Sequence, residues 1–285
     1  MTIWVIGNCQ ARGVAKSVES LTKSSDVRPL DIRTIMQADD AGKANLASQV
    51  SRSDILLIQK PDDHAGPFSI ERLRASGYRA VAFPSFGFAG FHPDLCYIKC
   101  NGVYINGALF SYHSSIVAAA YLEGLSQQRA CALFNRFTYA SLGLRGVYDA
   151  TLPILKKHMA EAGHDHSEAL SRGVFMHTIN HPWVELLFEV AKQALNMAGV
   201  PTHSDAGCPP DELGEGVVWP VYPGISNDIA GNFDFQIRAG EIIDLQEFVA
   251  QSYDSYGILS DGYEAIRVDK AREFIQRELI KPKAA

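Results

Sequence analysis

The chain has 285 residues, of which 47% are hydrophobic and 20% charged, a composition typical of folded globular proteins and not of disordered ones. Its 32 Asp and Glu residues against 26 Lys and Arg give a formal net charge of −6, which disfavours nucleic-acid binding because that function needs a basic surface. No apolar run reaches the roughly 18–20 residues that cross a bilayer, and the pattern of a secretory signal is not seen, so we expect a protein without a membrane span. The five cysteines, an odd number, are scattered without the spacing of a disulfide framework, so we expect it in the cytoplasm.

Short apolar runs alternate with helical patterns over residues 1–90. Ile3-Trp4-Val5-Ile6 predicts a buried strand that ends at Gly7, and apolar residues at helical spacing predict a helix from about residue 10. Further strands are predicted over 31–36, 54–58 and 80–83, with a short helix over 70–76. Strands that are apolar on both faces and separated by helices indicate an α/β fold with an N-terminal parallel sheet and flanking helices.

From about residue 111 the pattern becomes mainly helical. A split into an α/β sheet part (1–110) and a mainly helical C-terminal part (111–285) is therefore predicted, although no linker marks it and a single integrated domain is equally consistent. Residues 200–240 are rich in Gly and Pro and predict a long irregular loop. Helices are predicted over 115–125, 127–142, 147–162, 182–198 and 269–280.

The sharpest local feature is Gly7-Asn8-Cys9-Gln10, where the first strand turns into the first helix. Ligands of open α/β sheets bind beyond the carboxyl ends of the strands, and a helix N-terminus there favours anions. The partial positive charge of this helix N-terminus is expected to lower the pKa of the Cys9 thiol and to make it a nucleophile. The alternative is that Cys9 is a small buried apolar residue. Arg12 and Lys16, one turn apart on the helix, are expected either to meet a phosphate or to face water.

A second candidate is His181, which precedes Pro182 at the predicted start of the 182–198 helix. A neutral imidazole there would serve as a general base, whereas the alternative is that Asn180 and His181 only cap the helix. His177 and His181 have the spacing of a zinc pair, but no Glu lies between them and Pro182 disfavours a helix through both. We therefore expect no metal site.

A third candidate is the segment 83–94, Phe-Pro-Ser-Phe-Gly-Phe-Ala-Gly-Phe-His-Pro-Asp, which is too rich in Pro and Gly to be regular throughout. It predicts either an aromatic-walled pocket or a hydrophobic plug, and His92 is hard to explain as part of a plug. Gln59 follows the 54–58 strand and is expected at the same crevice as Cys9 if their strands are parallel neighbours.

Together these blocks resemble the WcbI family of capsular polysaccharide biosynthesis proteins. The resemblance rests on Gly-Asn-Cys-Gln at 7–10, the aromatic block at 83–94 and His-Thr-Ile-Asn-His-Pro at 177–182, which occur in the family's order. It implies a topology distantly similar to SGNH-type hydrolases, with Cys9 where those enzymes carry a serine nucleophile. The downstream Asp-x-x-His of SGNH enzymes is not evident, so the partner histidine is expected among His92, His113, His177 and His181.

The resemblance implies a coenzyme-A-dependent acyltransferase that moves an acetyl group from acetyl-CoA to a hydroxyl of a surface polysaccharide or its precursor. Two alternatives stay open: an SGNH-like esterase or deacetylase, and a non-catalytic protein that binds a glycan or CoA. The expected catalytic residues are Cys9, His181 and His92; the expected substrate or oxyanion contacts are Gly7, Asn8, Gln10, Gln59, Ser85 and Asn180; the expected CoA contacts are Arg12, Lys16 and His113.

Overall fold

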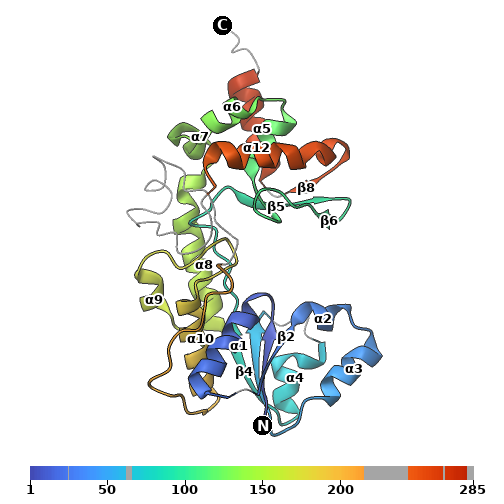
Figure 1. Ribbon diagram of the computed structural model, residues 1–285, viewed down its shortest axis with the longest axis vertical. Coiled ribbons are helices and arrows are strands. Elements are labelled where there is room, and N and C mark those ends of the chain that lie inside the picture. Colours follow the sequence, from blue (N-terminus) through green and yellow to red (C-terminus); the bar gives the residue numbers. More distant parts are fainter. Residues whose placement is uncertain (25, 62–65, 215–242, 266, 281–285) are drawn as a thin grey trace. The chain divides into compact units, whose positions relative to one another are not determined.

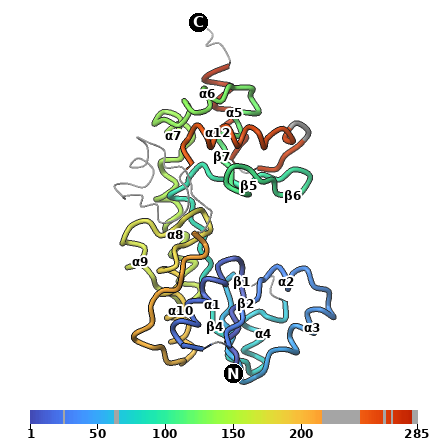
Figure 2. The backbone as a smooth tube through the Cα atoms, in the orientation of Figure 1, coloured from blue at the N-terminus to red at the C-terminus, as the bar shows by residue number. Residues whose placement is uncertain are grey.

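The computed structural model describes residues 1–24, 26–61, 66–214, 243–265 and 267–280 (Figure 1). The chain forms two compact units, each assembled from separate stretches of sequence. The first unit comprises Met1–Gly87, Pro153–Phe175 and Asn180–Glu215, and the second comprises Phe88–Leu152, Met176–Ile179 and Gly216–Ala285. Figure 2 follows the chain as it leaves the first unit after β4 and returns to it along α8. The domain boundary near residue 110 stays a prediction.

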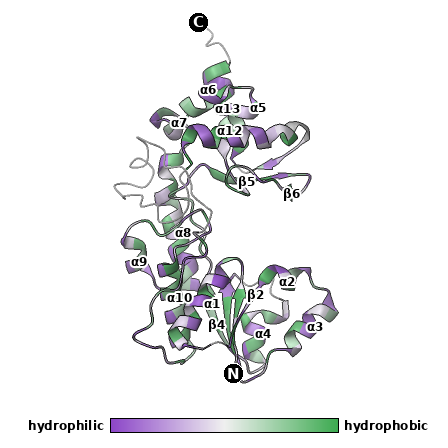
Figure 3. Cartoon of the chain, viewed as in Figure 1, coloured by the Kyte–Doolittle hydropathy of each residue, from purple (hydrophilic) through white to green (hydrophobic). Residues whose placement is uncertain are grey.

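A four-stranded parallel sheet forms the centre of the first unit, with the strand order β2-β1-β3-β4. Its two central strands, β1 (Ile3–Gly7) and β3 (Ile55–Lys60), are hydrophobic in Figure 3 and almost wholly buried. The carboxyl ends of neighbouring strands coincide, with Gly7 paired to Asp31. The remaining strands are β2 (Val27–Asp31) and β4 (Arg79–Pro84).

Helices cover both faces of this sheet (Figure 1). Trp4 and Ile6 of β1 alternate with Ile3 and Val5, and all four are buried, so each face of the strand has a core of its own. The core containing Trp4 and Ile6 also takes side chains from α2, η1 and α4. The helices of the unit are α1 (Gln10–Thr22), α2 (Ile32–Gln37), α3 (Asp40–Ser48), η1 (Gly66–Phe68), α4 (Ile70–Ala75), the later part of α8 (Val147–Glu161), α9 (Ser167–Ser171) and α10 (Val184–Met197).

Helix α10 packs directly on α1, since a Cβ added at Gly13 would lie 2.5 Å from Leu187 Cδ1. Glycine at this position lets the two helices approach closely. The predicted strands at 3–6, 54–58 and 80–83 and the helices from residue 10 and over 70–76 are confirmed as β1, β3, β4, α1 and α4. The parallel α/β layer is therefore as predicted.

The strand predicted over 31–36 is wrong. The second strand is β2, four residues earlier, and Ile32–Gln37 form helix α2. Strand β2 lies at the edge of the sheet and carries the exposed residues Arg28 and Pro29, so it shows no continuous apolar run. Asp31 then accepts a hydrogen bond from Arg33 N at 2.9 Å and caps α2, which ends the strand.

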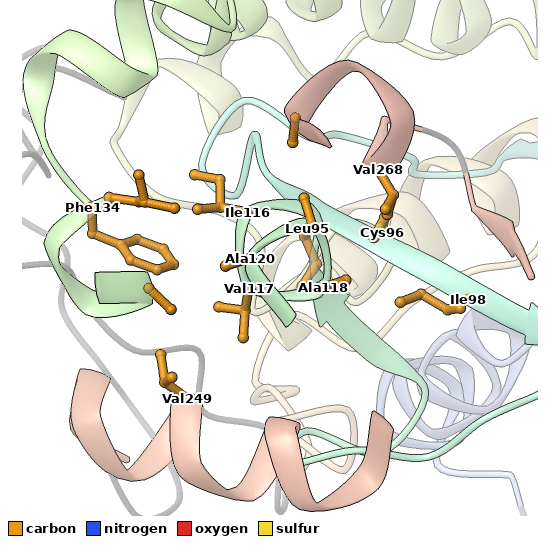
Figure 4. Packing of buried hydrophobic residues seen from close by; sticks show 14 of the residues in the cluster. Leu95, Cys96, Ile98, Ile116, Val117, Ala118, Ala120, Phe134, Val249 and Val268 are labelled. Carbon is orange, nitrogen blue, oxygen red and sulfur yellow. The ribbon is translucent and has the colours of Figure 1, made fainter. Parts of the chain in front are cut away.

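The second unit combines a small antiparallel sheet with a helical cluster. In the sheet β5 pairs with β6, β7 and β8. Figure 4 shows the core, in which α5 residues such as Val117 and Ala120 contact side chains of β5, α12 and α13. The elements are β5 (Leu95–Cys100), β6 (Val103–Tyr104), β7 (Tyr112–Ser114), α5 (Ser115–Leu122), α6 (Gln127–Ala132), α7 (Arg136–Ser141), η2 (Leu144–Gly146), the start of α8, α12 (Leu245–Ser255), η3 (Tyr256–Asp261), β8 (Glu264–Ala265), α13 (Val268–Ile275) and η4 (Gln276–Ile280).

The mainly helical C-terminal part is confirmed, with corrections to its detail. The helix predicted over 127–142 is two helices, because the Asn135 side chain accepts from Thr138 N at 3.0 Å and begins α7 anew. Helix α10 begins at Val184, two residues later than predicted. Residues 200–214 are irregular as expected, while the rest of the predicted loop lies outside the described residues. Among the described helices, none combines the length and apolar character that a membrane crossing requires.

Asp54 fastens the amino-terminal ends of β1 and β3. Its carboxylate accepts hydrogen bonds from Thr2 N and Ser51 N, each at 2.9 Å, and from Trp4 Nε1 at 3.2 Å. Burial alone would raise the pKa of Asp54, but these three donors hold it below its usual value. The ionised carboxylate therefore stabilises the fold above its unfolded pKa, and this contribution is lost as pH falls through the lower folded pKa.

We expect Asp54→Asn to reduce the free energy of unfolding by about 1–3 kcal/mol at pH 7, because the amide turns a donor toward other donors. Urea denaturation of the variant and the wild type should show this difference shrinking as pH falls below about 4, because the carboxylate of the unfolded chain then takes up a proton while the folded one is still ionised. An equal difference at pH 7 and pH 3 would contradict this role for Asp54.

Candidate active site at the β1–α1 turn

The candidate site lies at the carboxyl ends of β1 and β2, where β1 turns into α1 (Figure 1). A cavity of about 380 Å³ opens there, and Cys9 is the N-cap residue of α1 at its wall. The volume is in the range of small-molecule sites. The cavity is lined by Asn8, Cys9, Ala11, Arg12, Gly13, Pro29, Leu30, Asp31, Arg33, Glu212 and Leu213.

Side-chain amides fix the backbone of this turn. Asn8 N donates to Gln59 Oε1 at 2.8 Å, and Gln10 N donates to Asn8 Oδ1 at 2.9 Å. Gln59 Nε2 in turn donates to Gln10 Oε1 at 2.9 Å. The strands of Cys9 and Gln59 are parallel neighbours, as the prediction for Gln59 required, because β1 pairs with β3. Gln59 lies within β3, however, and is not among the residues that line the cavity. Gln59 is only 7% exposed, and its hydrogen bonds to Asn8 N and Gln10 Oε1 stabilise the turn from the buried side.

The Gln10 side chain joins the turn to two other segments. Its Nε2 donates to Phe86 O and to Asn180 O, each at 2.7 Å, and its Oε1 also accepts from Phe86 N at 3.0 Å. Gln10 is 1% exposed, and with Gln59 its amide makes four hydrogen bonds. The residue after Cys9 thereby holds the segment after β4 and the segment that contains His181.

Gly7 makes this packing possible. A Cβ at this position would lie 2.7 Å from Gln59 Oε1 and 2.8 Å from Gln59 Cβ, distances that real Cβ atoms do not show. Any larger residue would push the Gln59 side chain away from Asn8 N. The contribution of Gly7 is therefore the space that it leaves for the amide network.

The expectation that the helix N-terminus lowers the Cys9 pKa is corrected by the structure. Burial raises the pKa of the half-buried thiol, Arg33 lowers it, Asp31 raises it, and the N–H groups of Cys9 and Gln10 lower it, with a net shift upward. Desolvation of the thiolate thus outweighs the helix N-terminus. Cys9 is a protonated thiol at neutral pH, and it needs a base before it can act as a nucleophile.

Two ion pairs flank the thiol. The Arg33 guanidinium binds Asp31 through Nε, at 3.1 Å from Oδ1 and 3.0 Å from Oδ2, and Arg12 Nε lies 3.5 Å from Glu212 Oε2. Each arginine is thus balanced by a carboxylate. Asp31, Arg33 and Glu212 were missed by the sequence analysis, because the strand was predicted at 31–36 and nothing linked residue 212 to the turn.

The structure places the other predicted residues as follows. Lys16 pairs with Glu19 at 3.1 Å on α1. Ser85 is half-buried just after β4 and its N–H donates to Lys60 O at 3.1 Å. His181 is half-buried, immediately after the Asn180 carbonyl that Gln10 binds. Their roles in binding and catalysis stay predictions.

His92 and His113 belong to the second unit, and both are buried. Burial lowers the pKa of His92 to about 3, although a hydrogen bond with the His177 backbone opposes this. Burial also lowers the pKa of His113, whose ring nitrogens lie 3.2 Å from Tyr256 Oη and 3.1 Å from Ile105 O. Direct contact of His113 with a ligand would require these hydrogen bonds to break.

Comparison with known proteins gives two matches. The family model described as polysaccharide biosynthesis enzyme WcbI matches residues 2–203. A solved structure of WcbI, described as a polysaccharide biosynthesis enzyme in its native form without a disulfide bond between CoA and a cysteine, has a TM-score of 0.58 and 17% identity, and the match covers 95% of this chain and 98% of that one. At this identity the likeness shows a shared fold. A comparison with curated proteins finds no match.

The charges around Cys9 predict how its reactivity depends on pH. We expect alkylation of Cys9 by iodoacetamide, followed by mass spectrometry of its peptide, to have an inflection above the value of about 8.5 for a free cysteine. Arg33→Gln should move the inflection upward because it removes a positive charge, and Asp31→Asn should move it downward.

Lys16→Gln is the matched control for Arg33→Gln. It also removes one positive charge, but from a residue of α1 that is not among those lining the cavity. It should leave the inflection in place. An inflection that is unmoved in both Arg33→Gln and Asp31→Asn would show that these residues do not act on the thiol.

Proposed function

Because the chain belongs to the WcbI family of polysaccharide biosynthesis enzymes, we propose that it is a CoA-dependent acyltransferase that moves an acetyl group from acetyl-CoA to a sugar hydroxyl. The observation that carries the proposal is Cys9, a thiol at a helix N-cap on the wall of a cavity with two arginines. A thiol exchanges acyl groups with a thioester at little cost, because the bond that forms is of the same type as the bond that breaks.

Arg12 and Arg33 are the cationic residues proposed to bind coenzyme A. Both line the cavity, and CoA carries phosphate groups that a planar guanidinium binds well. The Arg12 side chain is 75% exposed and its contact with Glu212 is 3.5 Å, so little is lost if a phosphate displaces the carboxylate. The similar WcbI structure, which is distinguished by having no disulfide bond between CoA and a cysteine, supports this ligand.

In the first step, His181 takes the proton of the Cys9 thiol and Sγ attacks the acetyl carbon of acetyl-CoA. The Sγ–C bond forms, the C–S bond to CoA breaks, and the CoA sulfur leaves with the proton that His181 returns. In the second step His181 takes the proton of a sugar hydroxyl, whose oxygen attacks the acetyl-Cys9 carbon. The sugar ester forms, and the departing Cys9 sulfur is reprotonated.

Asn8 is proposed to stabilise the oxyanion of both steps. Its Oδ1 accepts from Gln10 N at 2.9 Å, which fixes the amide orientation and leaves Nδ2 as a donor without a hydrogen bond in the described part of the chain. The backbone N–H of Gln10 already donates to Asn8 Oδ1, and the backbone N–H of Asn8 already donates to Gln59 Oε1. Neither is therefore assigned to the oxyanion. One oxyanion donor is typically worth about 3–4 kcal/mol in the transition state.

The two-step route predicts an acetylated enzyme. We expect wild type incubated with acetyl-CoA in the absence of any sugar to gain the mass of one acetyl group, located on the Cys9 peptide by tandem mass spectrometry. Cys9→Ala should gain none and should still bind CoA in calorimetry. Cys208→Ala, which alters an exposed cysteine of the same unit, is the control and should behave as wild type.

His181→Asn separates proton transfer from binding. It should slow acetylation by about 10²–10⁴-fold while the affinity for CoA is unchanged, because the imidazole acts only as acid and base. Binding of CoA without acetylation of any variant would contradict the thiol carrier. No binding of CoA or acetyl-CoA at all would overturn the acyltransferase function and favour an esterase or a glycan-binding protein.

A further inference from the structure

A separate groove of about 660 Å³ lies in the second unit, between α5 and the segment that runs from η3 into α13. The site proposed for acyl transfer does not use it, since none of its lining residues belongs to the first unit. Its walls combine two tyrosines and two leucines with one carboxylate and one guanidinium. They are Tyr121, Leu122, Leu259, Tyr263, Asp269 and Arg272.

The polar wall is a continuous hydrogen-bonded chain. Arg272 Nε donates to Glu123 Oε1 at 2.7 Å, Arg272 Nη1 donates to Tyr263 Oη at 2.9 Å, and Tyr263 Oη donates to Asp269 Oδ1 at 2.7 Å. Within the described residues, Asp269 Oδ2 and Arg272 Nη2 have no hydrogen bond in this chain. The groove therefore offers Asp269 Oδ2 as an acceptor and Arg272 Nη2 as a donor, and the hydrogen bonds above hold both side chains in place.

The charges indicate which kind of ligand fits. The Glu123 side chain is only 10% exposed, and it neutralises Arg272 and also accepts from Gln276 Nε2 at 3.0 Å. Asp269 is therefore the uncompensated charge of the lining. An anionic ligand such as a phosphate or a carboxylate would meet this carboxylate and would have to compete with Glu123 for the guanidinium. A neutral ligand that both donates and accepts hydrogen bonds meets neither cost.

The aromatic wall supplies the apolar part of the site. Tyr121 packs edge-to-face against Tyr253 and Tyr256, with ring centroids 5.2 and 5.6 Å apart, so its ring is held rigidly. Leu122 and Leu259 add apolar surface. A pyranose ring has the matching character, since its C–H groups can lie on an aromatic or aliphatic surface while its hydroxyls both donate and accept.

The loop that carries this wall is also fixed. Cys100 Sγ lies 3.2 Å from both Ile258 O and Gly262 O, so its single S–H donates to these two carbonyls in turn or is shared between them. Gly262 has a φ of 132°, a conformation that residues with a side chain rarely adopt. The segment between Leu259 and Tyr263 is thereby tied to β5, which lowers the conformational cost of binding a ligand.

We propose that this groove binds a neutral pyranose residue. The inference rests on the proposed function in that the sugar would be a unit of the saccharide acceptor. Asp269 Oδ2 accepts from one ring hydroxyl, Arg272 Nη2 donates to a neighbouring hydroxyl, and the tyrosine and leucine side chains contact the C–H groups.

The test uses the full chain without CoA, so its result does not depend on acyl transfer. Saturation-transfer NMR would measure the binding of methyl glucoside, methyl galactoside and methyl mannoside, with glucuronate and glucose 1-phosphate as anionic comparators. We expect at least one neutral glycoside to bind wild type with a millimolar Kd and more tightly than either anion. Asp269→Asn should weaken this binding roughly tenfold, as for a lost charge-assisted hydrogen bond.

Asp149→Asn is the matched control, because Asp149 is an exposed carboxylate in the first turn of α8 of the same unit and does not line the groove. It should bind as wild type does. Tyr263→Phe, which keeps the ring but breaks the hydrogen-bonded chain, is a second variant should Asp269→Asn fold poorly. The proposal is overturned if no neutral glycoside binds, if an anion binds more tightly, or if the groove variants bind as the control does. Loss of glycoside binding with normal acetylation of Cys9 would separate this site from the acyl-transfer site.

Discussion

One buried amide organises the candidate active site. The Gln10 side chain, with four hydrogen bonds and almost no exposure, connects the turn after β1 to Gln59, to the backbone of Phe86 and to the carbonyl of Asn180. An unsatisfied amide at this depth would be costly, so the three segments are held together as a set. Gly7 leaves the space for this network, and Cys9 is held between two residues that belong to it.

The environment of Cys9 sets its chemistry. Burial outweighs Arg33 and the helix N-terminus, so the resting thiol stays protonated and resists adventitious oxidation or alkylation. A thiol of this kind suits a two-step transfer in which a base removes the proton only when the thioester is bound. The Asp31–Arg33 and Arg12–Glu212 pairs balance the charges that line the cavity, while each offers a guanidinium to an anionic ligand.

Sequence patterns predicted those elements whose burial shows in the spacing of their own apolar residues. The central strands β1 and β3 are buried on both faces and appear as apolar runs, and α1 shows its buried face at helical spacing. Edge strand β2 has no such pattern, and the strand was predicted over 31–36 instead. Asp31 and Arg33 were therefore not predicted as residues of the site. Cys9 was found because a strand-to-helix turn is visible in sequence. Glu212 was not, because only tertiary structure brings it beside Arg12. The rise in the Cys9 pKa likewise depends on burial by distant residues.

In the proposed mechanism Cys9 carries the acetyl group from CoA to the sugar hydroxyl. Acetyl exchange between acetyl-CoA and deuterium-labelled CoA, measured by mass spectrometry without any sugar, tests it most directly, because exchange requires the enzyme to hold the acetyl group while one CoA leaves and another enters. Wild type should exchange the label, and Cys9→Ala should not. Transfer to a sugar by an enzyme that catalyses no such exchange would contradict it.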